Sequence, residues 1–457
     1  MRCRPPPGTG PVAERKARRH FAADSVQVLS GQVAMMAIGI VNGIITARWL
    51  GPADRGRFAL LVLLPTMLSN FVKLGIPQAS VYYMRRRNAS PSDVASNSVW
   101  IAFVTGTIAA LVCYYWRDWL IAKFLKDTPA MLIPPSLALI PFVTLQFYFL
   151  GVAQAQERFR DYNVWQIGPN VLALIGLLIT VVMLHMGLVG AVIVQVAIQV
   201  IMTAWMAWRV NRAAPLRLRW NGTLARGMLA FGSKSYVQTL AATLHLRIDQ
   251  YICAYFLPPA QVGLYAIAVN FGSLLLKIPE ATGTVMFPRI AGSGDRDAHA
   301  ATTRVCRSTL FVLALGVLGF GIAGPILIPI LYGHKYDGAI RPLLILLPGL
   351  LVMALYQLLT RNFTSRNKQE VNIFAACLAL ALNVTLNIFL IPRFGISGAA
   401  LANGMSYGTA ALVLLVAFIR DSGHSVGETL IVRPTEIGEM ARAARRMAAR
   451  VQGRKAA

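Results

Sequence analysis

Twelve apolar stretches, each long enough to cross a lipid bilayer, dominate this chain of 457 residues. A membrane-spanning helix needs about 20 predominantly apolar residues. Only 14% of the residues are charged, against about 25% in typical soluble proteins. The sequence therefore predicts an all-α polytopic membrane protein. The predicted spans lie near residues 25–47, 57–84, 95–116, 130–153, 162–185, 187–208, 231–255, 262–288, 305–331, 340–360, 370–391 and 396–419.

The chain also contains an internal duplication. The stretch WLGPADRGRFAL at 49–60 matches FLPPAQVGLYAI at 256–267, and in both an apolar helix gives way to a Pro/Gly turn and another apolar helix. Further pairs match at a nearly constant offset, among them Arg158 with Arg366 and Gly187 with Gly395. Equivalent residues of the two copies are six spans apart. Because six is an even number, the chain is back on the same side of the membrane, and we expect both halves to have the same orientation. Parallel repeats of this kind are typical of transporters that bind substrate between the halves.

The duplication defines the predicted domains, which are two parallel six-helix lobes. The segments are a basic N-terminal tail (1–24), an N-lobe with spans 1 to 6 (25–208), a basic linker (209–230), a C-lobe with spans 7 to 12 (231–419) and a basic C-terminal tail (420–457). Within the last segment, apolar and basic residues recur at helical spacing over 435–451. This pattern favours an amphipathic helix on an anionic membrane surface. A partly disordered tail is the alternative.

The net charge of +26 reflects membrane orientation rather than nucleic-acid binding. The basic residues lie in short clusters between the apolar stretches, and no nucleic-acid-binding motif is present. If the N-terminus is inside the cell, most of the 44 Lys and Arg residues fall in cytoplasmic segments, as the positive-inside rule requires. We therefore expect both termini in the cytoplasm and no nucleic-acid partner.

Catalytic and metal-binding motifs are absent from the sequence. The five cysteines have neither CxxC nor metal-ligand spacing, and we interpret them as small buried hydrophobic residues. There is no nucleophile elbow, HExxH or Walker A motif, and the loops are too short for a catalytic domain. The protein is therefore not expected to be an enzyme or to hold a metal ion or cofactor.

Ionisable residues within the predicted spans are the candidate functional residues, because a charge at the bilayer centre costs roughly 2.5–3.5 kcal/mol on insertion scales. In span 8, Lys277 and Glu280 are three residues apart and share a helix face. The candidates for substrate binding are Arg247, Lys277 and Lys73 within spans and Arg48 directly after span 1. Those for a charge network or ion coupling are Asp249, Glu280 and the polar Asn42, which is the repeat equivalent of Asp249.

Two interpretations of the charges in spans 7 and 8 stay open. They can form a neutral network of salt bridges that holds helices together. Alternatively, they line a hydrated cavity that binds an anionic headgroup and a coupling ion, Na⁺ or H⁺. The excess of Lys and Arg within the spans favours a phosphate-bearing substrate over a cationic drug. Asn383 and Asn387 in span 11 can likewise line a sugar path or, as is more common, hydrogen-bond helix to helix.

Several segments resemble a known family. TARWLGPADRGRFAL at 46–60 resembles the signature of polysaccharide and oligosaccharide flippases, in which span 1 ends in an arginine (here Arg48), a Leu-Gly-Pro turn follows and a Gly–aromatic pair opens span 2. Similar to other recurrent segments of that family are QAQERFRDYNVWQI (154–167), LAFGSKSY (229–236) and FGISGAALANGMSY (394–407). The resemblance implies a Wzx-like member of the multidrug/oligosaccharidyl-lipid/polysaccharide (MOP) exporter superfamily.

This resemblance implies a flippase that moves undecaprenyl-pyrophosphate-linked oligosaccharide across the bacterial cytoplasmic (inner) membrane by alternating access through a basic central cavity. Its expected partners are the lipid-linked oligosaccharide, membrane lipids and the polysaccharide polymerase and export machinery. Three alternatives are a multidrug or small-solute antiporter on the same fold, a membrane glycan polymerase or ligase, and a non-transporting scaffold. The first would favour an acidic cavity, and the second would need a large outer loop.

Cysteine labelling tests the predicted orientation. In a variant without native cysteines, single cysteines at Ser90 and Asn221 should react only with reagents applied from the cytoplasm, and those at Asp127 and Lys335 only from outside. Labelling at Asn221 from outside would rule out parallel repeats, because it would require an odd number of spans in the first half.

Overall fold

The computed structural model describes residues 11–217, 219–245, 247–291, 295–366 and 368–436 together with Gly438 and Arg442. All regular secondary structure in this part of the chain is helical. Seven helices are long and apolar enough to cross a membrane, or up to nine if each of two bent helix pairs counts as one span. The chain is therefore an all-α, multi-pass membrane protein.

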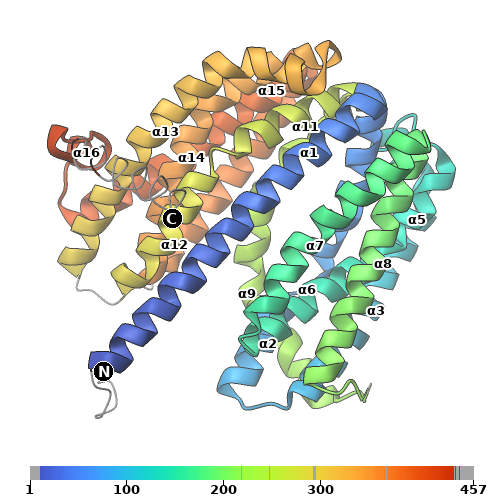
Figure 1. Ribbon diagram of the computed structural model, residues 1–457, viewed down its shortest axis with the longest axis horizontal. Helices are drawn as coiled ribbons and strands as arrows, with labels where there is room; N and C mark the ends of the chain where they lie inside the picture. The colour runs from blue at the N-terminus through green and yellow to red at the C-terminus, as the bar shows by residue number, and fades with distance from the viewer. Residues whose placement is uncertain are drawn as a thin grey trace, which may run out of the picture. The chain divides into compact units, whose positions relative to one another are not determined.

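The helices follow one another along the chain as Figure 1 shows. They are α1 (Pro11–Val72), α2 (Ile76–Arg86), α3 (Pro91–Tyr115), α4 (Arg117–Lys123), α5 (Ile133–Leu137), α6 (Leu139–Ala155), α7 (Phe159–Leu177), α8 (Gly187–Ala213), α9 (Gly222–His245), α10 (Ile248–Phe256), α11 (Pro259–Ser273), α12 (Lys277–Ala291), α13 (Asp295–Tyr332), α14 (Ile340–Ser365), α15 (Gln369–Ser422) and α16 (Val426–Leu430). Shorter 3-10 or π-helical segments are η1 (Ala130–Leu132), η2 (Leu178–Met183) and η3 (His334–Ala339).

Two of the longest helices contain a non-helical glycine. The backbone of Gly51 in α1 has φ 73° and ψ 174°, and that of Gly395 in α15 has φ 58° and ψ −140°. Each of these helices therefore consists of two helical segments. Gly187, the sequence equivalent of Gly395, also has a positive φ of 54°. Glycine adopts such angles at little cost, so the same residue type supports the same turn in both copies of the repeat.

The first helix begins earlier than the sequence pattern indicates. It starts at Pro11, although we expected a basic tail up to residue 24. Proline is favoured in the first helical turn, and the Ala, Glu, Lys and Arg residues that follow are good helix formers. Residues 1–10 and most of the predicted amphipathic helix at 435–451 lie outside the described residues. The boundaries of the lobes and the linker stay a prediction.

The chain divides into two compact units. Unit 1 comprises Met1–Trp49, Val72–Ala110 and Pro135–Gly232, and unit 2 comprises Leu50–Phe71, Leu111–Pro134 and Ser233–Ala457. The second segment of α1 therefore groups with the later half of the sequence.

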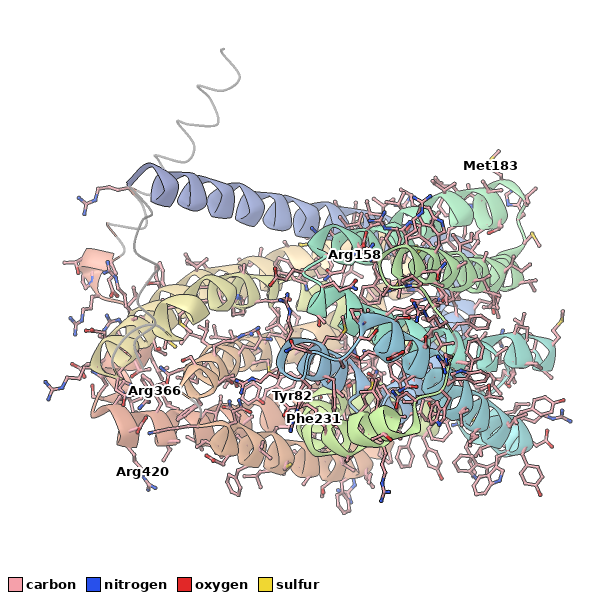
Figure 2. The ribbon with its side chains drawn as sticks, turned by 90° about the horizontal axis from the view of Figure 1, so that it is seen from below. Tyr82, Arg158, Met183, Phe231, Arg366 and Arg420 are labelled. Carbon is pink, nitrogen blue, oxygen red and sulfur yellow. The ribbon has the colours of Figure 1, made fainter. Side chains whose placement is uncertain are left out.

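Each unit has its own apolar core. In unit 1, Tyr148, Phe149 and Met228 are fully buried, and the ring of Tyr82 stacks on Phe231 with 4.1 Å between centroids (Figure 2). In unit 2, α13, α14 and α15 lie side by side (Figure 1), and the leucines between them are buried. Burial of this apolar surface holds the helices of each unit together.

An ion cluster in unit 1 joins the start of α7 to the end of α8. The buried carboxylate of Asp161 pairs with Arg158 and, at 2.6 Å, with Arg209. Arg158 also donates a hydrogen bond to the backbone oxygen of Arg209 at 3.0 Å. Because the carboxylate is buried, both arginines are needed to offset its desolvation.

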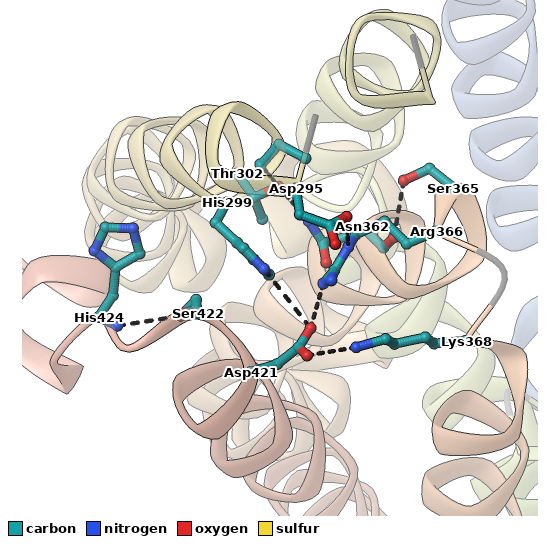
Figure 3. A network of polar contacts seen from close by, with 11 residues as sticks. Asp295, His299, Thr302, Asn362, Ser365, Arg366, Lys368, Asp421, Ser422 and His424 are labelled. Atoms are coloured by element: carbon teal, nitrogen blue, oxygen red, sulfur yellow. Dashed lines mark hydrogen bonds and ion pairs between the residues drawn. The ribbon is translucent and has the colours of Figure 1, made fainter. Parts of the chain in front are cut away.

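A related cluster in unit 2 surrounds Arg366, the repeat equivalent of Arg158. Arg366 follows α14, donates to Asp295 at 3.0 Å and pairs with Asp421 at the end of α15 (Figure 3). Lys368 pairs with the same carboxylate. In both copies of the repeat, ion pairs thus connect the loop after the fourth predicted span with the end of the sixth predicted span. In both, the loop contributes an arginine at the equivalent position, Arg158 or Arg366.

The two copies of the WLGPADRGRFAL repeat contact each other within unit 2. A Cβ atom on Gly56 would stand 1.7 Å from the carbonyl oxygen of Pro259, and one on Gly263 would stand 2.3 Å from that of Pro52. The two glycines are repeat equivalents, and so are the two prolines. The contact is therefore reciprocal, and it requires residues without a side chain, as in other closely packed membrane helices.

We expect Gly56→Ala to lower the melting temperature and the yield of the folded protein. The added methyl group would overlap backbone atoms, which cannot rotate away, and overpacking typically costs about 1–3 kcal/mol. Gly39→Ala is the matched control, since nothing lies within 4 Å of a Cβ atom at Gly39 in the same helix. Equal melting of the Gly56→Ala variant and the wild type in detergent would contradict the close contact.

Candidate functional site

A polar cavity of about 410 Å³ lies within unit 2. Four segments form its wall: the second segment of α1, the end of α9, the start of α10 and the helix α11. Its charged and polar lining residues are Arg55, Thr66, Asn70, Thr243, Arg247, Gln250, Tyr251 and Asn270. No acidic residue is among the described residues that line it. The cavity therefore has a net positive charge and can attract an anion.

Arg247 lies where the chain changes from α9 to α10. It precedes the first turn of α10 and has non-helical backbone angles, with φ −138°. Its backbone N–H donates to the carbonyl oxygen of Leu244 at 3.0 Å. The side chain is exposed and lines the cavity, and within the described chain no carboxylate forms an ion pair with it. The guanidinium is therefore available to an anionic ligand.

Arg55 is the second cation of the cavity, and the sequence analysis did not identify it. It is 9% exposed and lies close to Tyr332 and Tyr336. It lies between the predicted spans 25–47 and 57–84, so it is not among the charges within spans that we selected as candidates. Comparison of the two copies of the repeat could have identified Arg55, because the equivalent residue of the second copy is the apolar Val262. A charge present in only one copy of a repeat indicates a role beyond the turn itself.

Asp249 points into the protein instead of lining the cavity. It is 1% exposed, and its Oδ2 atom accepts hydrogen bonds from Tyr265 at 2.5 Å and from Asn403 at 2.7 Å. The other oxygen, Oδ1, is buried beside the backbone of Gln250 and has no well-formed hydrogen bond from any described residue. A buried carboxylate oxygen without a donor is costly unless it binds a proton or a cation.

Neutral amides extend this network. Asn383 donates to Oδ1 of Asn403 at 2.8 Å and to the hydroxyl of Ser406 at 2.8 Å, and Asn387 donates to Oδ1 of Asn383 at 2.8 Å. The two contacts of Asn383 with Asn403 and Ser406 cross the break at Gly395 within α15, whereas the contact of Asn387 stays within the first segment of that helix. The interpretation that the two asparagines of span 11 hydrogen-bond helix to helix is therefore confirmed for Asn383.

In one of the two open interpretations, the four charges of spans 7 and 8 form a network of salt bridges. Among the described residues, the hydrogen-bond partners of the Asp249 side chain are the neutral side chains of Tyr265 and Asn403. Lys277 and Glu280 pair with each other at 2.8 Å, as their spacing predicts, and both are more than 40% exposed. An exposed pair of this kind contributes roughly 0–1 kcal/mol. Neither residue lines the cavity.

The remaining candidates, Asn42, Lys73 and Arg48, all belong to unit 1. Asn42 donates to the backbone oxygen of Asn170 at 2.9 Å. Lys73 follows the last turn of α1, is 9% exposed and places its ammonium 5.1 Å from the ring centre of Phe147, a cation–π contact. Arg48 is exposed. The structure thus places Arg247 in the unit 2 cavity, whereas Lys277, Lys73 and Arg48 do not line it.

The sequence is similar to those of known flippases over part of its length. A probable low-salt glycan biosynthesis flippase of Haloferax volcanii is 21% identical over 210 residues, which cover 45% of this chain and 44% of the relative. A candidate O-antigen transporter of Shigella flexneri is 22% identical over 186 residues, which cover 40% and 44%. The matches thus span less than half of each relative.

The fold is that of two kinds of solved membrane transporter. The lipid II flippase MurJ in an inward closed conformation aligns with a TM-score of 0.75 over 87% of this chain and 90% of its own, at 15% identity. An inward-facing multidrug resistance MATE family transporter of the MOP superfamily aligns with a TM-score of 0.70 over 85% and 95%, at 16% identity.

A family model described as "Polysaccharide biosynthesis protein" matches residues 45–341, the region that contains the repeated turn, the cavity and Asp249. The match covers well over half of the chain. The protein therefore belongs to the family that this model describes, the polysaccharide biosynthesis protein family.

Proposed function

We propose that the protein moves undecaprenyl-pyrophosphate-linked oligosaccharide across the bacterial cytoplasmic (inner) membrane by alternating access through a basic central cavity. The observation that carries the proposal is the cavity of unit 2, which is lined by both Arg55 and Arg247 and by no acidic residue of the described chain. A pyrophosphate is a multiply charged anion with several oxygens. Planar guanidinium groups bind such oxygens through paired, charge-assisted hydrogen bonds.

The two parts of the substrate place different demands on the protein. The polyprenyl tail can stay in the bilayer, whereas the pyrophosphate and sugars have to be shielded from it. The cavity offers amide and hydroxyl groups beside the two arginines, among them Asn70, Asn270 and Thr66. These groups suit the hydroxyls of the first sugar. Arg48, Lys73 and Lys277 lie elsewhere, and contacts of theirs with the substrate stay a prediction.

The proposal requires twelve spans with both termini in the cytoplasm. The breaks at Gly51 and Gly395 support counting α1 and α15 as two spans each. The bent pairs α1–α2 and α11–α12, with bends of 46° and 41°, support a broken second span in each half. Polysaccharide polymerase and export proteins are the partners that we propose to receive the translocated lipid.

Asp249 is the proposed coupling residue. Its buried Oδ1 atom, which has no well-formed hydrogen bond from a described residue, can take up a proton or contribute to binding a Na⁺ ion. Binding would neutralise the carboxylate and strengthen the packing of α10 against α15, to which Asn403 belongs. A gradient of that ion would thereby bias one conformation of unit 2 over another.

The main alternative is a multidrug or small-solute antiporter, which the fold similarity to a MATE transporter favours. A pocket for cationic drugs would be expected to carry acidic lining residues. The cavity has the opposite sign, so this alternative ranks second.

Charge-conserving substitutions test the anion site. Arg247→Lys and Arg55→Lys should each reduce flipping of a fluorescent lipid-linked oligosaccharide in proteoliposomes by about tenfold or more, because lysine cannot form the bidentate contact. Arg57→Lys is the matched control, since Arg57 pairs with Asp54 at 2.7 Å and does not line the cavity. Full transport by an Arg55→Ala, Arg247→Ala double variant would eliminate the proposed site.

Substitution of the buried carboxylate tests coupling separately. Asp249→Asn keeps an oxygen for the Tyr265 hydroxyl but cannot take up a proton or balance the charge of Na⁺. We expect this variant to fold and to bind substrate while transport no longer responds to an imposed Na⁺ or H⁺ gradient. Glu280→Gln, at the exposed pair, should retain the response. An unchanged gradient response in Asp249→Asn would refute the coupling role.

A further inference from the structure

A second pocket in unit 2, of about 590 Å³, lies between α13, α14, α15 and the C-terminal segment. All of the residues that line it are apolar, among them Phe311, Val352 and Leu430. Leu412 at its margin is 60% exposed, so the pocket opens at the surface. Apolar cavities of this size bind small or chain-like apolar ligands. The pocket shares no lining residue with the arginine cavity.

A buried ion pair holds the C-terminal segment against this pocket. The side chain of Arg307 in α13 is 7% exposed, pairs with Glu436 at 2.6 Å and donates to the backbone oxygen of Glu428 at 2.8 Å. Between these two attachment points lie Leu430 and Val432, which contribute to the pocket wall. Residues 428–436 are thus held beside the pocket, with Leu430 and Val432 forming part of its wall.

The closed end of the pocket is basic. Arg304 lies two turns before Phe311 on the same face of α13, Arg433 follows Val432, and both arginines are exposed. Arg420, at the end of α15, is exposed as well (Figure 2).

The acidic groups nearby already have partners. The backbone N–H of Ser425 donates to the carboxylate of Glu428 at 3.0 Å, which lowers the pKa of that group, and Arg307 and Arg304 both interact with Glu436. The guanidinium of Arg433 lies 3.8 Å from the carboxylate of Glu428, so the two form an ion pair. Positive charge therefore exceeds negative charge at this end.

We propose that this pocket binds one acyl chain of an anionic membrane phospholipid, with the lipid phosphate at Arg304 and Arg433. The apolar lining suits a hydrocarbon chain, and clustered arginines beside a membrane attract anionic headgroups. The bound chain lies against α13, α14 and α15 on one side and the C-terminal segment on the other. The lipid thereby stabilises the attachment of the chain end to unit 2.

Two glycines allow a matched pair of variants. A Cβ atom on Gly408, which lines the pocket, would meet no atom within 4 Å. Gly408→Leu therefore fills the pocket without a backbone clash. Gly319 is also helical and also has nothing within 4 Å, but it does not line the pocket. Gly319→Leu controls for the added side chain and for the gain in helix propensity.

The experiment uses purified, delipidated full-length protein and dioleoyl phosphatidylglycerol as the probe, with dioleoyl phosphatidylcholine in a parallel arm. Native mass spectrometry counts the retained lipid, and a melting curve reports stabilisation. We expect the wild type and Gly319→Leu to retain one phosphatidylglycerol and to melt at a higher temperature in its presence. Gly408→Leu should bind it roughly tenfold more weakly, a difference of ~1.4 kcal/mol. Arg304→Gln with Arg433→Gln should abolish the preference over phosphatidylcholine.

A second measurement is independent of the variants. Phosphatidylglycerol with a photoreactive group in one acyl chain should crosslink the wild type mainly at the pocket residues of α13, α14 and α15. Crosslinks spread evenly over the apolar helices of both units would overturn the proposal, and so would unchanged lipid retention by Gly408→Leu. Stronger competition by undecaprenyl phosphate than by phosphatidylglycerol would also overturn it, because the pocket would then belong to a polyprenyl chain.

Discussion

The structure of unit 2 depends on the close approach of two backbones where the copies of the Pro/Gly turn meet. Gly56 faces the carbonyl of Pro259, and Gly263 faces that of Pro52. Side chains at either glycine would push α1 and α11 apart, although both helices contribute to the wall of the cavity. Arg55 is adjacent to Gly56 in the sequence, so the glycine contact also positions the backbone from which its side chain reaches the cavity. The same glycine contact thus packs the two copies of the repeat against each other and positions the backbone of Arg55 beside the cavity.

Arg247 and Asp249 form no direct ion pair among the described residues, although they are only two residues apart. Arg247 precedes α10 with non-helical backbone angles, whereas Asp249 lies in the first turn of that helix. One side chain therefore lines the cavity while the other contacts Tyr265 and Asn403. A direct ion pair between them would neutralise both. In the mechanism that we propose, this separation leaves the arginine for an anionic substrate and the carboxylate for a small cation or a proton.

Apolar periodicity and the Pro/Gly pattern were sufficient to predict the all-α membrane fold, the repeat and the turns at Gly51 and Gly395. Residue spacing also predicted the pair of Lys277 and Glu280, because both lie within one helical turn. The partners of Asp249 could not be predicted in this way, since Asn403 is 154 residues away and contacts between distant helices leave no local pattern. Arg55 was missed because a charge beside a turn is usually a solvated loop residue.

The grouping of residues 50–71 with unit 2 has a consequence for biosynthesis. The chain emerges from the ribosome N-terminus first, and domains generally fold in that order. The ion cluster of Asp161 can form once residue 209 has been made, because all its members precede the second half. The second segment of α1, in contrast, has to wait for Pro259 and Gly263 before its glycine contact can form. A segment inserted among the first is therefore among the last to be packed, and until then it depends on the membrane or on other proteins to shield its polar groups.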